Sequence, residues 1–430
     1  MAPPPTRSPG NGALLPRSRL PSRGRVWLFR MTAVLLSSAL SVAGLEVCWR
    51  LLKFKRVGIP AGIEHPHFHH RLKANQTYHF NSAEFSVDIR TNRYGLRWPD
   101  PVLPKPPGVF RILILGDSFT FGFPVRDEEA FCRLIEQGLR AKGYPVEVIN
   151  AGVSGYSPTL HYVSLRDEYM AFEPDLVLLW YDLGDLQEDH WYQKNLVYDA
   201  TGRIVRCDPA YINGRFDGWE WVRTHSLIAN YLDRKCIRLY GYLKVLGLGG
   251  FIRAKLRGQR AKVAVAQLKA KQWAPDLSAH DRFLMVRDYA TEEQLAPYWA
   301  LSSRYLRMIR ELLAERGVPL VLGIYPYGML VGPQQWAAGR GYWGFEPGKT
   351  YEASAALTIF NRFSSETGVP LLNTFESFRA ADRTGKLFYD EDGHFTPAGH
   401  RVLAEHVLGD GRFLAFLAER IHQASSHLSK

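Results

Sequence analysis

The sequence predicts an α/β fold built on a doubly wound parallel sheet. Short apolar segments rich in Val, Ile and Leu alternate with helical patterns between residues 109 and 190, and the alternation resumes between 297 and 373. This order is typical of βαβ units, whose strands pair in parallel and are buried on both faces. With 430 residues, 46% of them hydrophobic and 22% charged, the chain is long enough to bury a full core.

The elements can be placed in order along the chain. The first part contains a strand at 110–115, a helix at 128–142, a strand at 146–150, a further helix and a strand at 176–181. The second part contains a helix at 297–316, a strand at 318–325, a helix at 353–367 and a strand at 370–373. Before the sheet, Phe85, Val87 and Ile89 alternate as on a half-buried strand.

The segment at about 191–296 interrupts this alternation. A structureless loop of that length is improbable in a compact domain, so we expect a helical insertion with a role of its own. The insertion and the later segment at 325–345 are rich in aromatic residues, namely Trp191, Trp219, Trp221 and Trp273 in the first and Tyr327, Trp336, Tyr342 and Trp343 in the second. Their rings either pack the insertion onto the sheet or form a lid or a carbohydrate-stacking platform.

A candidate nucleophile stands at the end of the first strand. The motif Gly-Asp-Ser-Phe places Ser118 directly behind the apolar run, and α/β sheets bind ligands at the carboxyl ends of their strands. The motif is also a common strand-to-helix turn, in which Ser118 would be an N-cap residue. A second motif, Asp-Gly-His near the C-terminus, favours catalysis, because a serine needs a base and a group that orients this base. His394 is the candidate base, oriented by Asp392 in preference to Glu391.

These motifs resemble those of the SGNH (GDSL-type) hydrolases, membrane-anchored bacterial type, over residues 85 to 410. Gly-Asp-Ser-Phe, the segment from Asn150 to Ser157 and Asp-Gly-His are similar to the family's first, second and fifth blocks in order and spacing. The resemblance implies a flavodoxin-like three-layer α/β/α sandwich with esterase or acyl-transfer chemistry. By position, Ser118 is the nucleophile and His394 the base, and the backbone N–H groups of Ser118 and Gly155 are oxyanion donors.

One oxyanion position departs from the family pattern. The family's third block ends a strand with Asn-Asp, and its asparagine donates to the oxyanion, whereas this chain has Gly184 there. Loss of one donor costs about 10²–10³ in turnover. Either the enzyme is slow, another group substitutes, or the fold serves binding; Asp182 cannot substitute, because an anion would repel the oxyanion. If the donor is simply missing, Gly184→Asn should raise turnover. Lower activity would mean that another group fills the position or that the glycine's backbone freedom is needed.

The N-terminal part predicts a membrane anchor. Residues 1–25 are rich in Pro, Arg, Gly and Ser, and we expect them to be disordered. Residues 26–52 are apolar, and we interpret them as an uncleaved transmembrane anchor rather than a signal peptide, although Ser-Val-Ala within them has the spacing of a cleavage site. The uncharged centre of this segment runs from Met31 to Leu45. Six arginines precede this centre and four basic residues follow it closely, which places the catalytic domain on the extracytoplasmic (periplasmic) side. A lead-in segment at 53–108 connects to the hydrolase-like domain at 109–430.

The formal net charge of +12 is concentrated in one stretch. Residues 234–271 contain eleven Lys and Arg and no acidic residue, with aromatic and aliphatic residues between them. Such a stretch is either a solvated face or a surface for an anionic membrane or an acidic polymer, and nucleic acid is not expected for an exported domain. The four cysteines lack metal-ligand spacing, although Cys207 and Cys236 could pair. We expect no metal and no cofactor.

Together these observations predict a membrane-anchored serine esterase or O-acyltransferase that acts on ester groups outside the cytoplasm. O-acetyl groups of a cell-envelope glycan are the candidate substrate, from the compartment and the aromatic residues. The alternative is a catalytically weak SGNH-like module that binds polysaccharide, which the glycine at position 184 would permit. Labelling of Ser118 by a fluorophosphonate separates the two hypotheses.

Overall fold

The computed structural model describes residues 23–51, 63–82, 84–209, 226–257, 281–288 and 290–428. The chain divides into two compact units. The smaller comprises Met1–Phe54 and Gly218–Arg234, and the larger comprises Lys55–Asp217 and Lys235–Lys430. The N-terminus that we expect to be disordered lies outside the described residues up to position 22.

The smaller unit contains the apolar helix α1 (Arg23–Leu51). Its 29 residues rise about 43 Å, more than the ~30 Å of a bilayer's hydrocarbon core. Among the described residues it is the one helix long and apolar enough to cross a membrane, so it could be a membrane span or a signal sequence. Near its end, the Glu46 carboxylate accepts hydrogen bonds from Ser226 Oγ (3.0 Å) and from the backbone N–H of Ile228 (3.1 Å). Glu46 thereby caps the start of α7 (Leu227–Leu256).

The larger unit is built on a five-stranded parallel sheet in the order β11-β10-β7-β5-β6. The strands are β5 (Phe110–Gly116), β6 (Val146–Gly152), β7 (Leu176–Tyr181), β10 (Leu320–Ile324) and β11 (Leu371–Asn373). In chain order this is the flavodoxin-like arrangement 2-1-3-4-5, so the predicted fold class is confirmed. The strand order reverses between β5 and β7, and ligands bind at such a switch point, outside the carboxyl ends of the strands.

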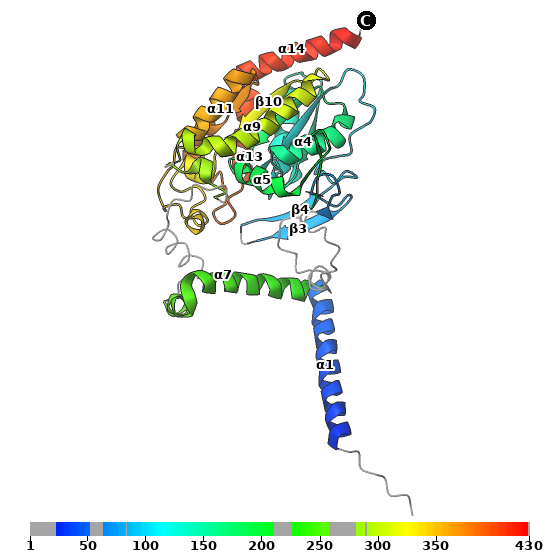
Figure 1. Ribbon diagram of the computed structural model, residues 1–430, viewed down its shortest axis with the longest axis vertical. Coiled ribbons are helices and arrows are strands. Elements are labelled where there is room, and N and C mark those ends of the chain that lie inside the picture. Colours follow the sequence, from blue (N-terminus) through cyan, green and yellow to red (C-terminus); the bar gives the residue numbers. More distant parts are fainter. Residues whose placement is uncertain are drawn as a thin grey trace, which may run out of the picture. The chain divides into compact units, whose positions relative to one another are not determined.

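Helices cover both faces of the sheet (Figure 1). One group is α3 (Phe131–Ala141), α12 (Phe375–Ala381) and α13 (Pro397–Gly409), and the other is α4 (Pro158–Asp167), α5 (Asp185–Tyr192), α9 (Glu292–Ala314) and α11 (Ser354–Thr367). Successive side chains of a strand point to opposite faces. Accordingly the Trp180 ring lies 5.6 Å from Phe131 of α3, and the Tyr181 ring lies 5.0 Å from Phe360 of α11. The result is the expected three-layer sandwich.

The ends of some elements differ from the predicted ones. A separate 3₁₀ turn occupies Asp127–Glu129, so α3 begins at Phe131 rather than at 128. Helix α9 begins five residues before Pro297, because Thr291 and Gln294 form a capping box in which each side chain accepts from the other's backbone N–H. The short helix α12 and the C-terminal helix α14 (Gly411–Leu428) are additional to the prediction.

The described part of the insertion is only partly helical. After α5 the chain forms an antiparallel hairpin of β8 (Leu196–Tyr198) and β9 (Ile204–Cys207), and α7 follows with a kink at Gly247 (φ 67°). Cys207 is buried and Cys236 exposed, and both are free thiols, so the pairing left open by the sequence is absent.

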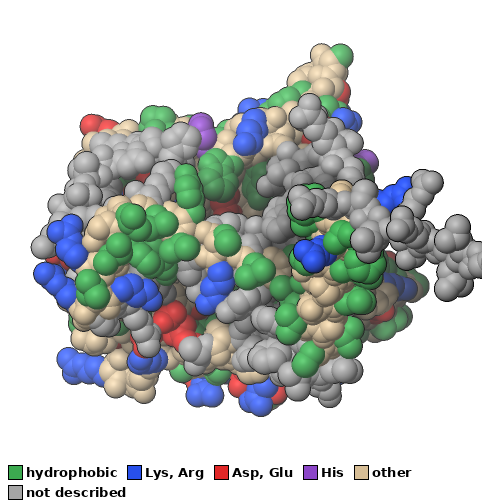
Figure 2. Space-filling model, turned by 90° about the horizontal axis from the view of Figure 1, so that it is seen from below, with side chains coloured by type: hydrophobic (Ala, Val, Ile, Leu, Met, Phe, Trp, Pro, Cys, Tyr) green, Lys and Arg blue, Asp and Glu red, His purple; other side chains and the backbone are tan. Residues whose placement is uncertain are grey.

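On the face drawn in Figure 2, Lys and Arg side chains are dispersed among hydrophobic ones. Three of the insertion's tryptophans (Trp219, Trp221 and Trp273) and the basic residues at 258–271 lie outside the described residues.

The lead-in segment forms two small antiparallel pairs, β1 (Ile63–Glu64) with β2 (His70–Arg71) and β3 (Thr77–Asn81) with β4 (Ser86–Arg90). Val87 and Ile89 of β4 are buried, as their alternation predicts.

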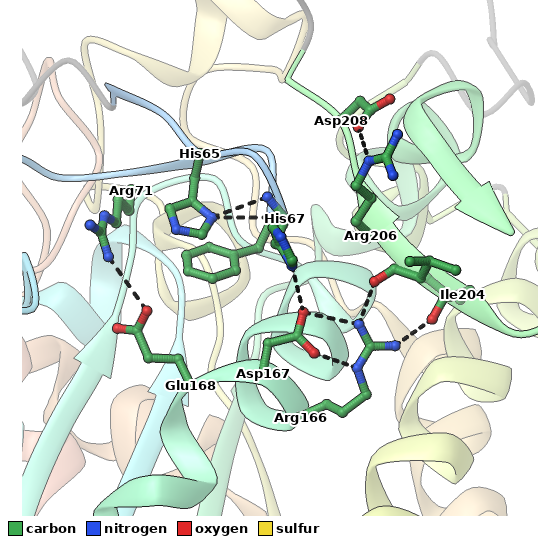
Figure 3. Close-up of polar contacts among 11 residues, drawn as sticks. His65, His67, Arg71, Arg166, Asp167, Glu168, Ile204, Arg206 and Asp208 are labelled. Atoms are coloured by element: carbon green, nitrogen blue, oxygen red, sulfur yellow. Dashed lines mark hydrogen bonds and ion pairs between the residues drawn. The ribbon is translucent and has the colours of Figure 1, made fainter. Parts of the chain in front are cut away.

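The first of these pairs lies beside the end of α4 (Figure 3). His67 Nδ1 lies 3.6 Å from the Asp167 carboxylate, and Arg71 lies 3.4 Å from Glu168. On the same side, Arg166 donates to the backbone carbonyl oxygens of Ile204 and Val205, which fastens the β8–β9 hairpin. The lead-in segment and the insertion therefore meet at α4.

Candidate active site

Ser118 lies on the tight turn between β5 and the short helix α2 (Ser118–Phe121). The turn needs a glycine at 116, because a Cβ there would overlap the Thr120 hydroxyl. The Asp117 carboxylate accepts from the backbone N–H of Phe119 at 2.9 Å and so caps α2. The turn thus presents Ser118 at the carboxyl end of β5, next to the switch point of the sheet.

The loop before α13 brings a histidine and an aspartate to Ser118. Ser118 Oγ lies 2.8 Å from His394 Nε2, and His394 Nδ1 lies 2.5 Å from Asp392 Oδ1. The same carboxylate oxygen accepts the backbone N–H of His394 at 3.3 Å. An acceptor at Nδ1 fixes the tautomer that carries its proton there, which leaves the lone pair of Nε2 facing the serine. Of the two acidic residues that the sequence offered as partner, Asp392 makes this contact.

The surroundings of His394 set its proton affinity. Burial lowers the pKa of the imidazole, but the hydrogen-bonded carboxylate of Asp392 and the nearby Asp117 more than offset this, so the pKa is raised from its ordinary 6.5. The rings of Phe119 and Phe123 lie 4.6 Å and 5.3 Å from the imidazole. His394 is therefore in an apolar pocket, with a carboxylate that stabilises the imidazolium form.

The aromatic segment at 325–345 supports the histidine loop. The Gly339 N–H donates to the Asp390 carbonyl oxygen at 2.7 Å, and a Cβ at Gly393 would lie 2.7 Å from Trp336 Nε1. Tyr327 and Trp336 are buried, and Phe283 packs against both, at 5.4 Å and 6.0 Å between ring centroids. These two rings therefore pack the insertion onto the sheet and do not form a lid. The rings of Trp191 and Trp343 remain exposed, at 52% and 41%.

Buried carboxylates lie behind the serine, and sequence reasoning missed their role. Asp182, directly after β7, accepts from the hydroxyls of Tyr325 (2.8 Å) and Tyr327, and Tyr325 also lies 3.0 Å from Asp117. One hydroxyl proton can serve only one of two carboxylates. Burial and the charge of Asp182 raise the pKa of Asp117 to about 6. Their positions in the sequence could have predicted that they lie together, since Asp117, Asp182 and Tyr325 each directly follow the end of a strand.

No family model and no curated protein match the chain. Similar solved structures include the acetyl xylan esterase AlAXEase (12% identity, 70% of this chain and 100% of that chain, TM-score 0.34). A catalytic mutant of the acetylxylan esterase Axe2 from Geobacillus stearothermophilus (13%, 70% and 93%, 0.33) and a member of the lipolytic G-D-S-L family from Veillonella parvula (10%, 70% and 98%, 0.33) are also similar. The sheet order and the helices on both faces decide the fold. The chain has the flavodoxin-like three-layer fold that its resemblance to the SGNH hydrolases implies. At such low identities and TM-scores these similarities carry no information on substrate, so the function proposed below rests on the site itself.

In the SGNH frame, two of the expected oxyanion donors are backbone groups. The N–H groups of Ser118 and Gly155 donate to no other residue within the described part of the chain. The loop that carries Gly155 has positive φ there (77°) and is held by the Tyr192 hydroxyl, which donates to the Gly155 carbonyl oxygen at 2.6 Å. His70 Nε2 lies 2.9 Å from the Ser154 carbonyl oxygen, and the Val153 N–H donates to the Gly116 carbonyl oxygen. These contacts tie the loop to the Ser118 turn.

Gly184, the third expected position, provides no donor of its own. It has no side chain, and its backbone N–H already donates to Asp182 Oδ1 at 2.6 Å. Its φ of −84° and ψ of −15° are ordinary helical values, so the backbone does not require glycine here. Space does require it, because an added Cβ would lie 2.8 Å from Asp182 Oδ1 and 3.1 Å from both Arg282 Nε and the Tyr327 hydroxyl. Gly184→Asn could lose activity because another group fills the position or because the backbone needs a glycine. The geometry supports the first reason.

Proposed function

We propose that this chain is a serine esterase, which hydrolyses carboxylic esters or transfers their acyl group. The observation that carries the proposal is the continuous contact from Ser118 Oγ through the His394 ring to Asp392, at 2.8 Å and 2.5 Å. A serine is a weak nucleophile unless a positioned base removes its proton, and this arrangement supplies both the base and its orienting carboxylate.

The geometry supports a two-step reaction. Ser118 Oγ attacks the ester carbonyl carbon while its proton moves to His394 Nε2, and the imidazolium is stabilised by Asp392. The tetrahedral intermediate then collapses, the bond from carbon to the alcohol oxygen breaks, and His394 returns the proton to that oxygen. In the second step water, or a sugar hydroxyl, gives its proton to His394 and attacks the acyl carbon. The bond from the acyl carbon to Ser118 Oγ then breaks, and His394 gives the proton to Oγ, which regenerates the serine and the neutral imidazole.

We further propose that the substrate is an O-acyl group, such as acetyl, on a cell-envelope glycan, and that the domain lies on the extracytoplasmic side of a membrane. Two features support this. The helix α1 is long and apolar enough to span a bilayer, with arginines before it. The exposed rings of Trp191 and Trp343 are suited to stack on sugar faces.

The decisive experiment is labelling and hydrolysis with the full-length chain in detergent. A fluorophosphonate should label Ser118, and an aryl acetate should be hydrolysed. Ser118→Ala and His394→Ala should each lower turnover by at least about 10⁴-fold. His79→Ala is the matched control, because it removes another histidine hydrogen-bonded to an aspartate (Asp88, 2.7 Å), on the β3–β4 hairpin. Undiminished turnover in Ser118→Ala would refute the proposal.

A polysaccharide-binding module is the second candidate, and the glycine at position 184 is the observation in its favour. A binding module needs the fold and the exposed aromatic rings but no reactive serine. It predicts no labelling of Ser118 and full retention of glycan by Ser118→Ala. Labelling of Ser118 together with loss of hydrolysis in the alanine variant excludes this candidate as the protein's sole function.

A further inference from the structure

Arg282 lies at the position that the missing asparagine would occupy. The side chain of residue 184 would start from a Cβ that points at Arg282, whose Nε lies 3.1 Å from it. Arg282 belongs to the end of the insertion, far from Gly184 in sequence. The next residue, Phe283, is buried and packs on Tyr327 and Trp336, which fixes the backbone of Arg282 at the site.

The Nε–H of Arg282 is a hydrogen-bond donor that no acceptor in the described structure satisfies. The Nε atom is buried and has no hydrogen-bond partner in the described structure. The other end of the guanidinium is an ion pair with Glu188 at the long distance of 3.9 Å, and the side chain as a whole is 39% exposed. A buried donor without a partner costs free energy, so such a group beside Gly184, at the expected oxyanion position, points to a ligand that completes it.

The positive charge of Arg282 acts on the catalytic histidine and on the carboxylates behind Ser118. Burial lowers its pKa, but Tyr327, Glu188 and Asp182 outweigh this and raise it, so the guanidinium stays protonated. In return Arg282 acts to lower the pKa of His394 and of Asp117, which places it within electrostatic range of both. It also offsets the negative charge of the carboxylates behind Ser118, which would otherwise oppose an oxyanion there.

We propose that Arg282 is a catalytic residue that donates its Nε–H to the oxyanion of the tetrahedral intermediate, in place of the asparagine amide. This inference rests on the proposed esterase function. The donor forms a hydrogen bond to the carbonyl oxygen as negative charge develops, and no covalent bond of Arg282 changes. A charged donor in a water-poor site stabilises an anion more strongly than a neutral amide does. Gly184 is then the residue that leaves room for the arginine.

Arg282→Lys tests this atom directly. Lysine keeps the positive charge near Glu188 but has a methylene where arginine has Nε–H. With full-length protein and an aryl acetate, we expect Arg282→Lys and Arg282→Ala to lower kcat by about 10²–10³, with KM changed only a few-fold. Their affinity for a trifluoromethyl ketone, which forms an oxyanion on Ser118, should fall by the same factor. Arg307→Ala is the matched control, because it removes an arginine of similar exposure (44%) paired with one glutamate, Glu366.

The outcomes separate this inference from the proposed function. If Ser118→Ala keeps its activity, the esterase proposal fails and the role of Arg282 fails with it. If Ser118→Ala is inactive but Arg282→Lys retains kcat and ketone affinity within about three-fold, only the inference on Arg282 is overturned. A loss confined to KM, or a loss of kcat without a loss of ketone affinity, would also overturn it. Thermal melts show whether Arg282→Ala is folded, and Arg282→Lys keeps the test valid if it is not.

Discussion

Gly184→Asn, which restores the asparagine of the SGNH pattern, should lower activity in this protein. The new Cβ would lie 2.8 Å from Asp182 Oδ1 and 3.1 Å from Arg282 Nε, closer than atoms normally approach. Asp182 is fixed by Tyr325, Tyr327 and the N–H of residue 184 itself, so Arg282, which has the longer side chain, is the group that must move. Its displacement removes one oxyanion donor, which the asparagine amide replaces only if it reaches the same point.

The expected magnitude follows from these contacts. Loss of one donor corresponds to about 10²-fold in kcat, and overpacking of the buried cluster costs about 1–3 kcal/mol of stability. Steady-state hydrolysis of an aryl acetate and a thermal melt measure the two effects. Gly409→Asn is the matched control, because a Cβ at Gly409 meets nothing within 4 Å. A rise in turnover of the folded Gly184→Asn variant would refute the reasoning and restore the interpretation of a simply missing donor.

Three further predictions follow from the site and the insertion. Because the base must be neutral, kcat/KM should fall as the pH falls through the raised pKa of His394, which a pH–rate profile measures. Asp392→Asn should move this acidic limb of the profile to lower pH and reduce kcat by about 10⁴-fold. Arg282→Ala removes a cation that lowers the pKa of His394, so it should move the limb to higher pH. Trp336→Ala should destabilise the protein by about 3–5 kcal/mol in denaturant melts, because it removes the buried ring beneath the histidine loop. In a chain without the membrane helix α1, charge reversal of three exposed basic residues at the end of α7 should weaken sedimentation with anionic liposomes at low salt without reducing hydrolysis of a soluble ester. Binding that persists unchanged would leave these residues a solvated face. These residues are Arg253, Lys255 and Arg257.

Much of the fold could be predicted because each strand carries its own signal. Leu176–Tyr181 is a run of apolar residues buried on both faces, and its bounds in the structure are those predicted. Ser118 and His394 could be paired because each lies next to a recognisable element, Ser118 after a strand and His394 before a helix. Neither inference needed knowledge of distant contacts.

Other elements had local signals that were not used. The capping box of Thr291 and Gln294 marks the start of α9 in the sequence, but the prediction began at Pro297 instead. The turn of the β8–β9 hairpin contains Asp199 and Gly202, and the Asp199 carboxylate accepts the N–H groups of Thr201 and Arg203, as short polar turn residues do. The prediction of a helical insertion was therefore wrong for this hairpin.

The identity of the third oxyanion donor could not be read from any local pattern. Gly184 showed that a group was missing, but the group that fills its place comes from a segment almost a hundred residues later, in the insertion. Only the tertiary structure brings Arg282 to the end of β7, by packing Phe283 against Tyr327 and Trp336. The same packing explains why the aromatic segment is needed. It supports the histidine loop on one side and the arginine on the other, so the base and the proposed oxyanion donor are positioned by one cluster. An insertion that looks like an interruption of the sheet thereby becomes part of the proposed catalytic machinery.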